Sequence, residues 1–234
     1  MAAAFRKKHR HRSKTQTIVL RIAMIGIAVL MLGAVIGVVY KARQNQPVTA
    51  QNSWDITKTK YIKERPALDV ELLPVNRYSR PGRALEQVRG IVVHYTANPG
   101  TSAMQNRDYF AGLADSHETS ASSHFVIGLD GEIVQCIPCD EIAYASNNRN
   151  KDTIAIECCI PDETGKFNDS TYQSLLELTA WLVGRYDLSI EAVIRHYDVT
   201  GKNCPKYFVE NPQAWEQFHD DLAAYIEKNG VDKE

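Results

Sequence analysis

The sequence predicts a single α/β domain with a central mixed β-sheet flanked by helices, preceded by an N-terminal transmembrane helix. Three observations support this prediction. Runs rich in β-branched residues alternate with segments of helical spacing, two apolar runs are joined by an Asp-Gly turn, and an uncharged stretch lies near the N-terminus. The chain has 234 residues, of which 44% are hydrophobic and 24% charged, as expected for one globular domain with an appendage.

The first 40 residues predict a membrane anchor. Residues 1–21 contain seven basic residues and no acidic one, and the next 19, "IAMIGIAVLMLGAVIGVVY" (22–40), are uncharged. As a helix they would be about 28 Å long, close to the ~30 Å hydrocarbon core of a bilayer. A short basic run could also bind nucleic acid, but the apolar span behind it favours a membrane. We therefore predict a cytoplasmic segment at 1–21, a transmembrane helix at 22–40 and no nucleic-acid partner.

A cleaved signal peptide is the main alternative to an anchor. Its apolar region would be about 7–15 residues long and would end at a small-residue cleavage site. The span here is longer, Lys41 and Arg43 follow it directly, and "VTA" at 48–50 is a weak cleavage sequence. An uncleaved anchor is favoured, and the excess of positive charge before the span places everything after Tyr40 outside the cell.

Residues 41–67 are polar and have no apolar period, so they predict an extracellular linker, in which Trp54 and Tyr61 could lie at the membrane surface. The compact domain is predicted at 68–229. Within it, strands are expected where β-branched residues cluster: at 90–95, 153–159 and 190–197, and as a hairpin at 124–138 around Asp130-Gly131.

Helices are expected where apolar residues recur at helical spacing. The segments are 101–115, 168–186, and a last helix with Asn211 as its cap and Pro212 in its first turn. Helices mixed with strands and one hairpin indicate the mixed sheet of the predicted fold.

Two histidines lie at the ends of predicted strands and share a region with a cysteine. His94 lies one residue before the end of "GIVVHY", and His196 one residue before the end of "AVIRHY". Each alone would more often be a core residue than a ligand. Cys204, however, lies in a loop bounded by Gly201 and Pro205 that can fold back toward His196. A catalytic zinc site takes three protein ligands and leaves one position for water, and two imidazoles with one thiolate fit that requirement.

Four blocks of the sequence resemble the zinc-dependent N-acetylmuramoyl-L-alanine amidases, a family that also includes phage amidases and animal peptidoglycan recognition proteins. The resemblance covers about residues 68–206, in the blocks "GIVVHYTANPGTSAMQNRDYF", "SSHFVIGLDGEIVQCIP", "DTIAIECC" and "RHYDVTGKNCP". It implies one zinc ion held by His94, His196 and Cys204. It also implies a substrate, the amide between the lactyl group of muramic acid and the L-alanine of the peptide stem.

The resemblance further implies two catalytic residues. Lys202 lies where the family has a catalytic lysine, and Glu157 lies where many bacterial members have a catalytic glutamate. Other members use a tyrosine just before the histidine of the "HF" block, where this chain has Ser123. Glu157 would move a proton from the attacking water to the leaving nitrogen, and Lys202 would stabilise the oxyanion. Strand alternation places Glu157 on the face opposite Ile154 and Ile156.

Two further histidines have weaker assignments. His124 lies beside a resembling block and is expected to line the substrate cleft, without being a metal ligand. His117 lies in a Ser/Thr-rich loop and is expected to be exposed.

Apart from Cys204, four cysteines remain: Cys136, Cys139, Cys158 and Cys159. A disulfide between the first pair and the second is one possibility, and four free thiols are the other.

The predicted function is a membrane-anchored hydrolase that cleaves peptidoglycan at the outer face of a bacterial membrane. One alternative is a recognition module of the same fold that binds wall fragments without cutting them, which would be expected to lack a ligand such as Cys204. Another is a zinc peptidase acting on stem peptides. A third is a metal-independent cysteine hydrolase that uses Cys204 and His196.

Overall fold

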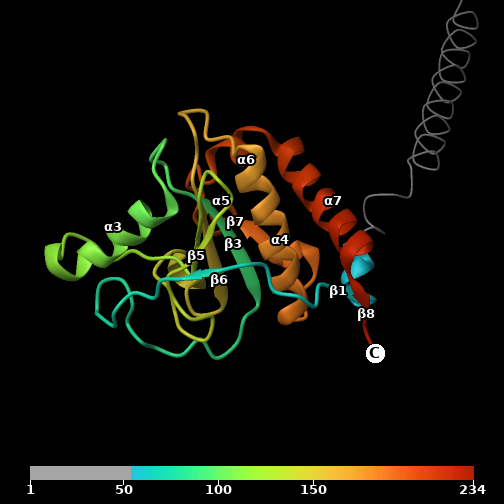
Figure 1. The fold of residues 1–234 in the computed structure, drawn as a ribbon, viewed down its shortest axis with the longest axis horizontal. Coiled ribbons are helices and arrows are strands. Elements are labelled where there is room, and N and C mark those ends of the chain that lie inside the picture. The colour runs from blue at the N-terminus through green and yellow to red at the C-terminus, as the bar shows by residue number, and fades with distance from the viewer. Residues whose placement is uncertain (1–53) are drawn as a thin grey trace, which may run out of the picture. The chain divides into compact units, whose positions relative to one another are not determined.

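The computed structural model describes residues 54–234. They form an α/β fold around a six-stranded mixed sheet with the strand order β2-β5-β4-β6-β3-β7 (Figure 1). The predicted α/β class with a central mixed sheet is therefore confirmed. The predicted cytoplasmic segment and transmembrane helix lie outside the described residues. Within 54–234, none of the helices has both the length and the apolar character needed to cross a membrane.

The centre of the sheet consists of the parallel strands β3 (Gly90–Tyr95) and β6 (Thr153–Cys158), which are buried on both faces. On its other side, β3 pairs with a third parallel strand, β7 (Val193–Arg195). Burial on both faces explains why these strands are continuous apolar runs rather than alternating ones. The predicted hairpin is present as β4 (Phe125–Ile127) and β5 (Ile133–Gln135), which are antiparallel, and β2 (Asp69–Val70) adds the edge.

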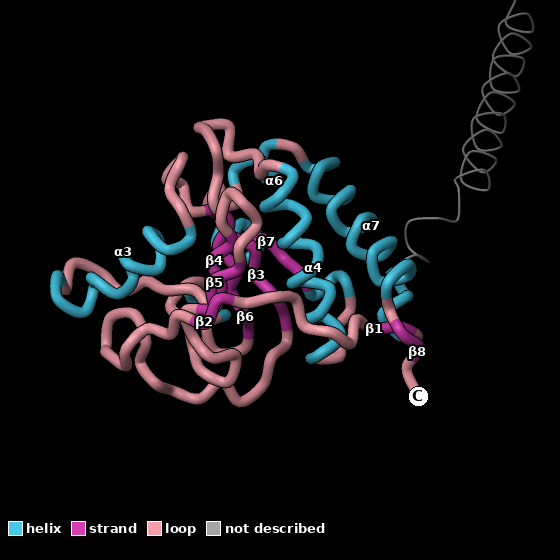
Figure 2. The backbone as a smooth tube through the Cα atoms, viewed as in Figure 1, coloured by secondary structure: helices cyan, strands magenta, loops and turns pink. Residues whose placement is uncertain are grey.

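Helices cover both faces of this sheet (Figure 2). Helices α4 (Asp169–Arg185) and α7 (Pro212–Asn229) pack on one face, where their leucines and aromatic residues join Ile91, Val93 and Ile154 in the larger core. Helix α3 (Ala103–Ser116) covers the other face and contributes to a smaller core. The remaining helices are short: α5 (His196–Thr200), α6 (Lys206–Glu210), and the 3-10 turns η1 (Trp54–Lys58), η2 (Asn147–Arg149) and η3 (Ile190–Ala192).

The helix starts follow the local sequence. Ser102 caps α3 by accepting a hydrogen bond from the Gln105 N–H. Asn168 caps α4 by accepting one from the Thr171 N–H. Asn211 occupies the predicted cap position of α7, but its side chain donates to the Tyr207 carbonyl instead of capping the helix. Pro212 begins this helix as predicted.

The fold extends beyond the predicted bounds of 68–229 at both ends. Strand β1 (Lys60–Tyr61) pairs with β8 (Val231–Asp232), so residues on either side of those bounds are held to each other. Trp54 donates a 2.9 Å hydrogen bond from its indole nitrogen to Asp220 and contacts His219 edge-on. Residues 54–66 therefore pack on the domain. Their apolar side chains are packed against α7 and α4, whereas those of a solvated linker would be exposed.

The segment predicted as one strand at 190–197 is divided into three parts. Strand β7 ends at Arg195, and His196 begins α5. The carboxylate of Asp198 accepts a 2.9 Å hydrogen bond from the Arg195 N–H, which starts a helical turn at the point where the strand would continue. His196 thus follows a strand end rather than occupying one.

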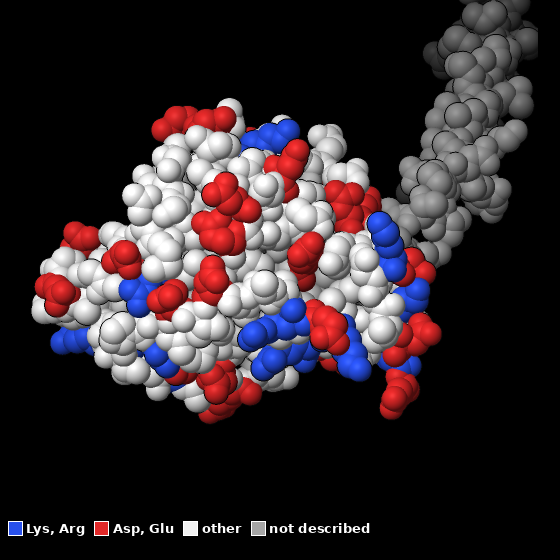
Figure 3. Space-filling view, viewed as in Figure 1, with Lys and Arg blue, Asp and Glu red and all other residues white. Residues whose placement is uncertain are grey.

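Charged side chains of both signs are present on the face of the domain drawn in Figure 3. Figure 3 shows acidic side chains spread over most of the face in view, with smaller groups of basic ones between them. Such a mixture is typical of a solvated protein surface.

Candidate metal centre

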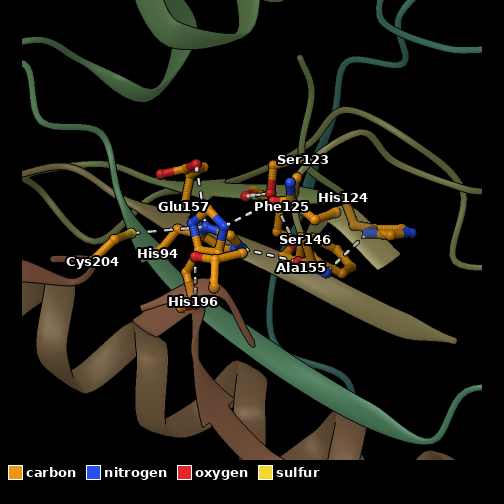
Figure 4. Close-up of polar contacts among 12 residues, drawn as sticks. His94, Ser123, His124, Phe125, Ser146, Ala155, Glu157, His196 and Cys204 are labelled. Atoms are coloured by element: carbon orange, nitrogen blue, oxygen red, sulfur yellow. Dashed lines mark hydrogen bonds and ion pairs between the residues drawn. The ribbon is translucent and has the colours of Figure 1, made fainter. Parts of the chain in front are cut away.

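The three predicted metal ligands come together at the carboxyl end of the central strands (Figure 4). His94 is near the end of β3, and His196 directly follows its parallel neighbour β7, so the pairing of these strands places both imidazoles at one edge. Their ring centroids are 4.6 Å apart. The thiol of Cys204 lies 3.9 Å from Nδ1 of His94. One ligand atom from each of the three residues lies within 4.8 Å of the other two, and all three residues are buried.

The loop that carries Cys204 folds back as predicted. Gly201 ends α5 with a φ of 76°, which suits glycine, and its N–H donates to the Tyr197 carbonyl. The Tyr197 N–H in turn donates a 2.8 Å hydrogen bond to the Cys204 carbonyl. These bonds return the chain to the first turn of α5, next to His196.

The chemistry of this donor set fits a zinc ion. Burial lowers the pKa of both His94 and His196, and the nearby charge of Lys202 lowers both further, so both imidazoles are neutral as a metal ligand requires. Burial raises the pKa of Cys204 to about 12, so the thiol keeps its proton in the metal-free protein. A bound cation would replace that proton, since thiolates ligate metals in deprotonated form.

Glu157 lies beside the three ligands. It pairs in register with His94 across the parallel strands β3 and β6, and its Oε1 lies 3.9 Å from Nδ1 of His94. Its side chain is 18% exposed, and among the described residues its buried Oε2 atom has no hydrogen-bond partner. Burial raises the pKa of Glu157 to about 8, against a lowering effect from Lys202. As predicted, it lies on the face opposite Ile154 and Ile156, which belong to the larger core.

One cleft contains all five predicted ligand and catalytic residues. Its volume is about 270 Å³, and His94, His196, Cys204, Glu157 and Lys202 all line it. The rest of its wall comes from the end of β3, one side of α3, and the loops before β4 and β6. Its remaining lining residues include Thr96, Asn106, Tyr109, Ser122 and Tyr144.

A larger cavity of about 650 Å³ lies elsewhere, at the C-terminal end of α4, where Arg65, Cys139 and Arg185 are among the lining residues. It contains none of the predicted site residues, so the smaller cleft is the candidate site.

His124 does not line the cleft, which corrects its predicted role. Its side chain is 1% exposed and bonded at both ring nitrogens: Nδ1 accepts from the Ala155 N–H at 3.0 Å, and Nε2 donates to the Glu141 carbonyl at 2.9 Å. The ring therefore ties β6 to the loop after β5. A histidine beside a strand could be assigned either way from sequence, and only the two backbone partners decide it.

Ser123, at the position of the family tyrosine, is also part of the core. Its hydroxyl lies 2.9 Å from the carbonyls of Phe125 and Ala155. His117 is exposed, as predicted, and stacks on Tyr78 with ring centroids 4.3 Å apart.

All five cysteines are unpaired, which selects the second of the two possibilities left open by the sequence. Cys136 and Cys159 lie in the smaller core, while Cys158 faces the larger one. Burial raises the pKa of Cys136 and Cys159 to about 12, so these thiols are packing residues with little thiolate character.

Sequence reasoning missed the loop between β5 and β6. Ser146 and Asn147 in this loop contact Nε2 of the two predicted ligand histidines. The available signal was a run of small polar residues, "ASNNRN" (145–150), directly before a central strand. By itself that run indicates only a turn.

Comparison with known proteins gives a consistent family. The family profile described as N-acetylmuramoyl-L-alanine amidase matches residues 84–207, which is more than half of the chain. The N-acetylmuramoyl-L-alanine amidase CwlL of Bacillus licheniformis is 35% identical over 173 residues, covering 68% of this chain and 47% of that protein. The N-acetylmuramoyl-L-alanine amidase BlyA of Bacillus subtilis (strain 168) is 32% identical, covering 69% of this chain and 48% of that protein. The chain thus spans about half the length of these relatives.

Solved structures agree. A mutant endolysin from Bacillus subtilis superimposes with a TM-score of 0.55 at 26% identity, covering 67% of this chain and 99% of that one. The catalytic domain of XlyA gives a TM-score of 0.55 at 25% identity, covering 66% of this chain and 99% of that one. With the fold, the ligand cluster and the profile match in agreement, the chain belongs to the N-acetylmuramoyl-L-alanine amidase family.

Proposed function

We propose that this protein is a zinc-dependent N-acetylmuramoyl-L-alanine amidase that cleaves peptidoglycan between muramic acid and the L-alanine of the stem peptide. The convergence of His94, His196 and Cys204 with Glu157 in one cleft, in a chain of this family, is the observation that supports the proposal most strongly. A recognition module would be expected to lack one of these ligands, and the chain has all three.

His94, His196 and Cys204 would hold the zinc ion. When bound, zinc in such a site activates water for attack near neutral pH and polarises a carbonyl oxygen. The three side chains are fixed by β3, by the first turn of α5 and by the loop that returns to it, so the site would need little rearrangement to bind.

Glu157 would act as the general base. Its buried Oε2 atom has no hydrogen-bond partner among the described residues and lies next to the proposed ligands, where a carboxylate can accept a proton from an attacking water and return it to the leaving nitrogen. Its pKa of about 8 in the metal-free protein would fall when a cation binds beside it, because a nearby positive charge favours the ionised form. The carboxylate would then be ionised at neutral pH.

Lys202 would stabilise the negative charge that develops on the substrate carbonyl. It lines the cleft, and its positive charge lowers the pKa of Glu157 and Cys204 as well as of both ligand histidines. A positive charge near the oxyanion stabilises the transition state more than the ground state.

Digestion of purified cell wall tests this function directly. The full-length protein should produce new L-alanine amino termini, detected by mass spectrometry, and a chelator should abolish them. Termini within the stem peptide would favour the peptidase alternative. Activity that survives removal of the metal would favour the cysteine hydrolase, and intact wall after prolonged digestion would contradict the enzyme altogether.

We also propose that residues 22–40 anchor the protein in the cell membrane by a single span, with residues 1–21 in the cytoplasm and the amidase domain outside. The uncharged length of 22–40 and the seven basic residues before it support this orientation. Protease added to intact, wall-stripped cells should remove the domain. A protected domain, or one found free in the medium after cleavage near Ala50, would contradict the anchor.

A further inference from the structure

Both ligand histidines are hydrogen-bonded through their second ring nitrogen to one loop. Nε2 of His94 lies 3.2 Å from the hydroxyl of Ser146, and Nε2 of His196 lies 3.2 Å from Oδ1 of Asn147. Figure 4 shows Ser146 beside the imidazoles, on the side away from Cys204. Two adjacent residues of one loop thus each contact Nε2 of one imidazole.

These contacts favour Nδ1 as the metal-binding nitrogen of each ring. The amide oxygen of Asn147 can only accept a hydrogen bond, so Nε2 of His196 must carry the proton and Nδ1 keeps its lone pair. Ser146 can accept from Nε2 of His94 in the same way, and Nδ1 of His94 already faces Cys204 and Glu157 at 3.9 Å. The free lone pair of each ring is then on Nδ1, and in His94 this is the nitrogen that faces the thiol.

The loop itself is held firmly. The side-chain oxygen of Asn150 accepts hydrogen bonds from the backbone N–H groups of Ala145 and Ser146, and the Ser146 carbonyl accepts from the Arg149 N–H at 2.9 Å. The hydroxyl of Thr153, at the start of β6, donates to the Arg149 carbonyl. Ser146 is 1% exposed, so its contact with His94 does not compete with bulk water.

We propose that Ser146 and Asn147 are positioning residues of the metal centre, which hold the imidazoles of His94 and His196 through Nε2 and leave Nδ1 of each ring free to bind zinc. The inference rests on the proposed zinc site and adds the two residues that orient it. Outer contacts of this kind fix ring orientation and raise ligand basicity, and their loss typically weakens metal binding about 10–100-fold.

The backbone at Asn147 allows a clean variant. Its φ is 53°, in the left-handed region that glycine adopts without strain and that aspartate tolerates better than most residues. Asn147→Gly therefore removes the acceptor without straining the turn, and Asn147→Asp keeps an acceptor at the same place. Ser146→Ala removes the other contact. Ser79→Ala is its matched control, because Ser79 is also buried and hydrogen-bonded but contacts Asn76 instead of a ligand.

The test measures binding of Zn²⁺ alone to the full-length protein, by competition with a chromophoric chelator. Asn147→Gly and Ser146→Ala should each weaken zinc binding about 10–100-fold. Asn147→Asp and Ser79→Ala should bind zinc close to the wild-type affinity. The absorption spectrum of the Co²⁺-substituted protein should change in the first two variants and not in the other two, which a general loss of stability would not produce.

Wild-type zinc affinity and an unchanged cobalt spectrum in both Asn147→Gly and Ser146→Ala would overturn the positioning role while leaving the proposed function intact. A wild-type protein that does not bind zinc would overturn the metal centre itself, and the positioning role with it. If Ser146→Ala does not fold, the comparison between Asn147→Gly and Asn147→Asp decides the inference, and equal affinities in that pair would contradict it.

Discussion

Nδ1 of His94 lies 3.9 Å from Oε1 of Glu157, although the two residues are far apart in the sequence. The parallel pairing of β3 with β6 places them directly opposite each other. The proposed metal ligand and the proposed proton acceptor are thus aligned by the backbone register of the most deeply buried strands. A shift of one residue in that register would turn one of the two side chains to the other face of the sheet.

Cys204→Ala should abolish tight zinc binding. The variant removes one of three ligands and leaves two neutral imidazoles, which hold zinc more weakly than a set that includes a thiolate. Metal analysis after dialysis against a mild chelator measures this. Cys136→Ala is the matched control, since that buried thiol lies in the smaller core, and it should keep its zinc. Full retention of zinc by Cys204→Ala would rule out this ligand set.

Glu157→Gln should lower turnover by about 10²–10⁴-fold while zinc content stays at the wild-type level. Glutamine keeps the shape of the side chain but cannot take up the proton. Turnover is measured on purified cell wall, with Glu163→Gln as the control because Glu163 is exposed. Near-wild-type turnover would mean that the base lies elsewhere. His124 is then no substitute, because both of its ring nitrogens are bonded to backbone in the core.

Lys202→Ala should reduce kcat by about 10²–10³-fold, the cost typical of losing one group that stabilises the oxyanion. The exposed Lys151 provides a matched control through Lys151→Ala, which removes the same charge away from the cleft. Kinetics on a soluble muropeptide separate the two parameters. A rise in KM with unchanged kcat would make Lys202 a substrate-binding residue instead.

His124 should make the metal-free protein less stable in acid. Burial lowers its pKa from 6.5 to about 4, so between these values the unfolded chain binds a proton that the folded chain does not. The free energy of unfolding therefore falls as pH falls from 6.5 to 4. At 1.36 kcal/mol per pKa unit, His124 accounts for roughly 3 kcal/mol of this loss.

His124→Gln should reduce that acid loss, as measured by urea unfolding between pH 7 and 4. Comparison with the wild type isolates His124 from His94, His196 and His219, whose pKa values are lowered by burial too. The exposed His117, changed to Gln, should leave the pH dependence as it is. An identical pH dependence in wild type and His124→Gln would show that His124 is protonated equally in both states.

Trp54→Ala should lower the free energy of unfolding by about 2 kcal/mol, because it removes a half-buried indole and its hydrogen bond to Asp220. Trp54→Phe keeps most of the packing and should lose only about 1 kcal/mol, the usual value of one hydrogen bond. Urea midpoints report both effects. Urea midpoints equal to that of the wild type would indicate that residues 54–66 behave as the linker that their polar composition predicts.

Several parts of this protein could be predicted from sequence because they depend on local patterns. The strand at 90–95, the Asp-Gly hairpin and the long helices follow from β-branched runs, turn residues and helical spacing. The ligand set could also be proposed, because His94 and His196 each lie near the end of a predicted strand with Cys204 in a nearby loop, and the resemblance to the amidase family implies the same three residues.

The tertiary structure decided what depends on contacts between distant segments. Residues 54–66 look like a linker by composition, and only the surface offered by α7 and β8 makes them part of the fold. His124 directly precedes β4 and His94 lies near the end of β3, so both are histidines of buried strand regions. One is bonded to backbone at both nitrogens, and the other presents a free nitrogen to a thiol. The residue type determines the chemistry of a side chain. Its role depends on which polar groups contact it, and those groups come from distant parts of the chain.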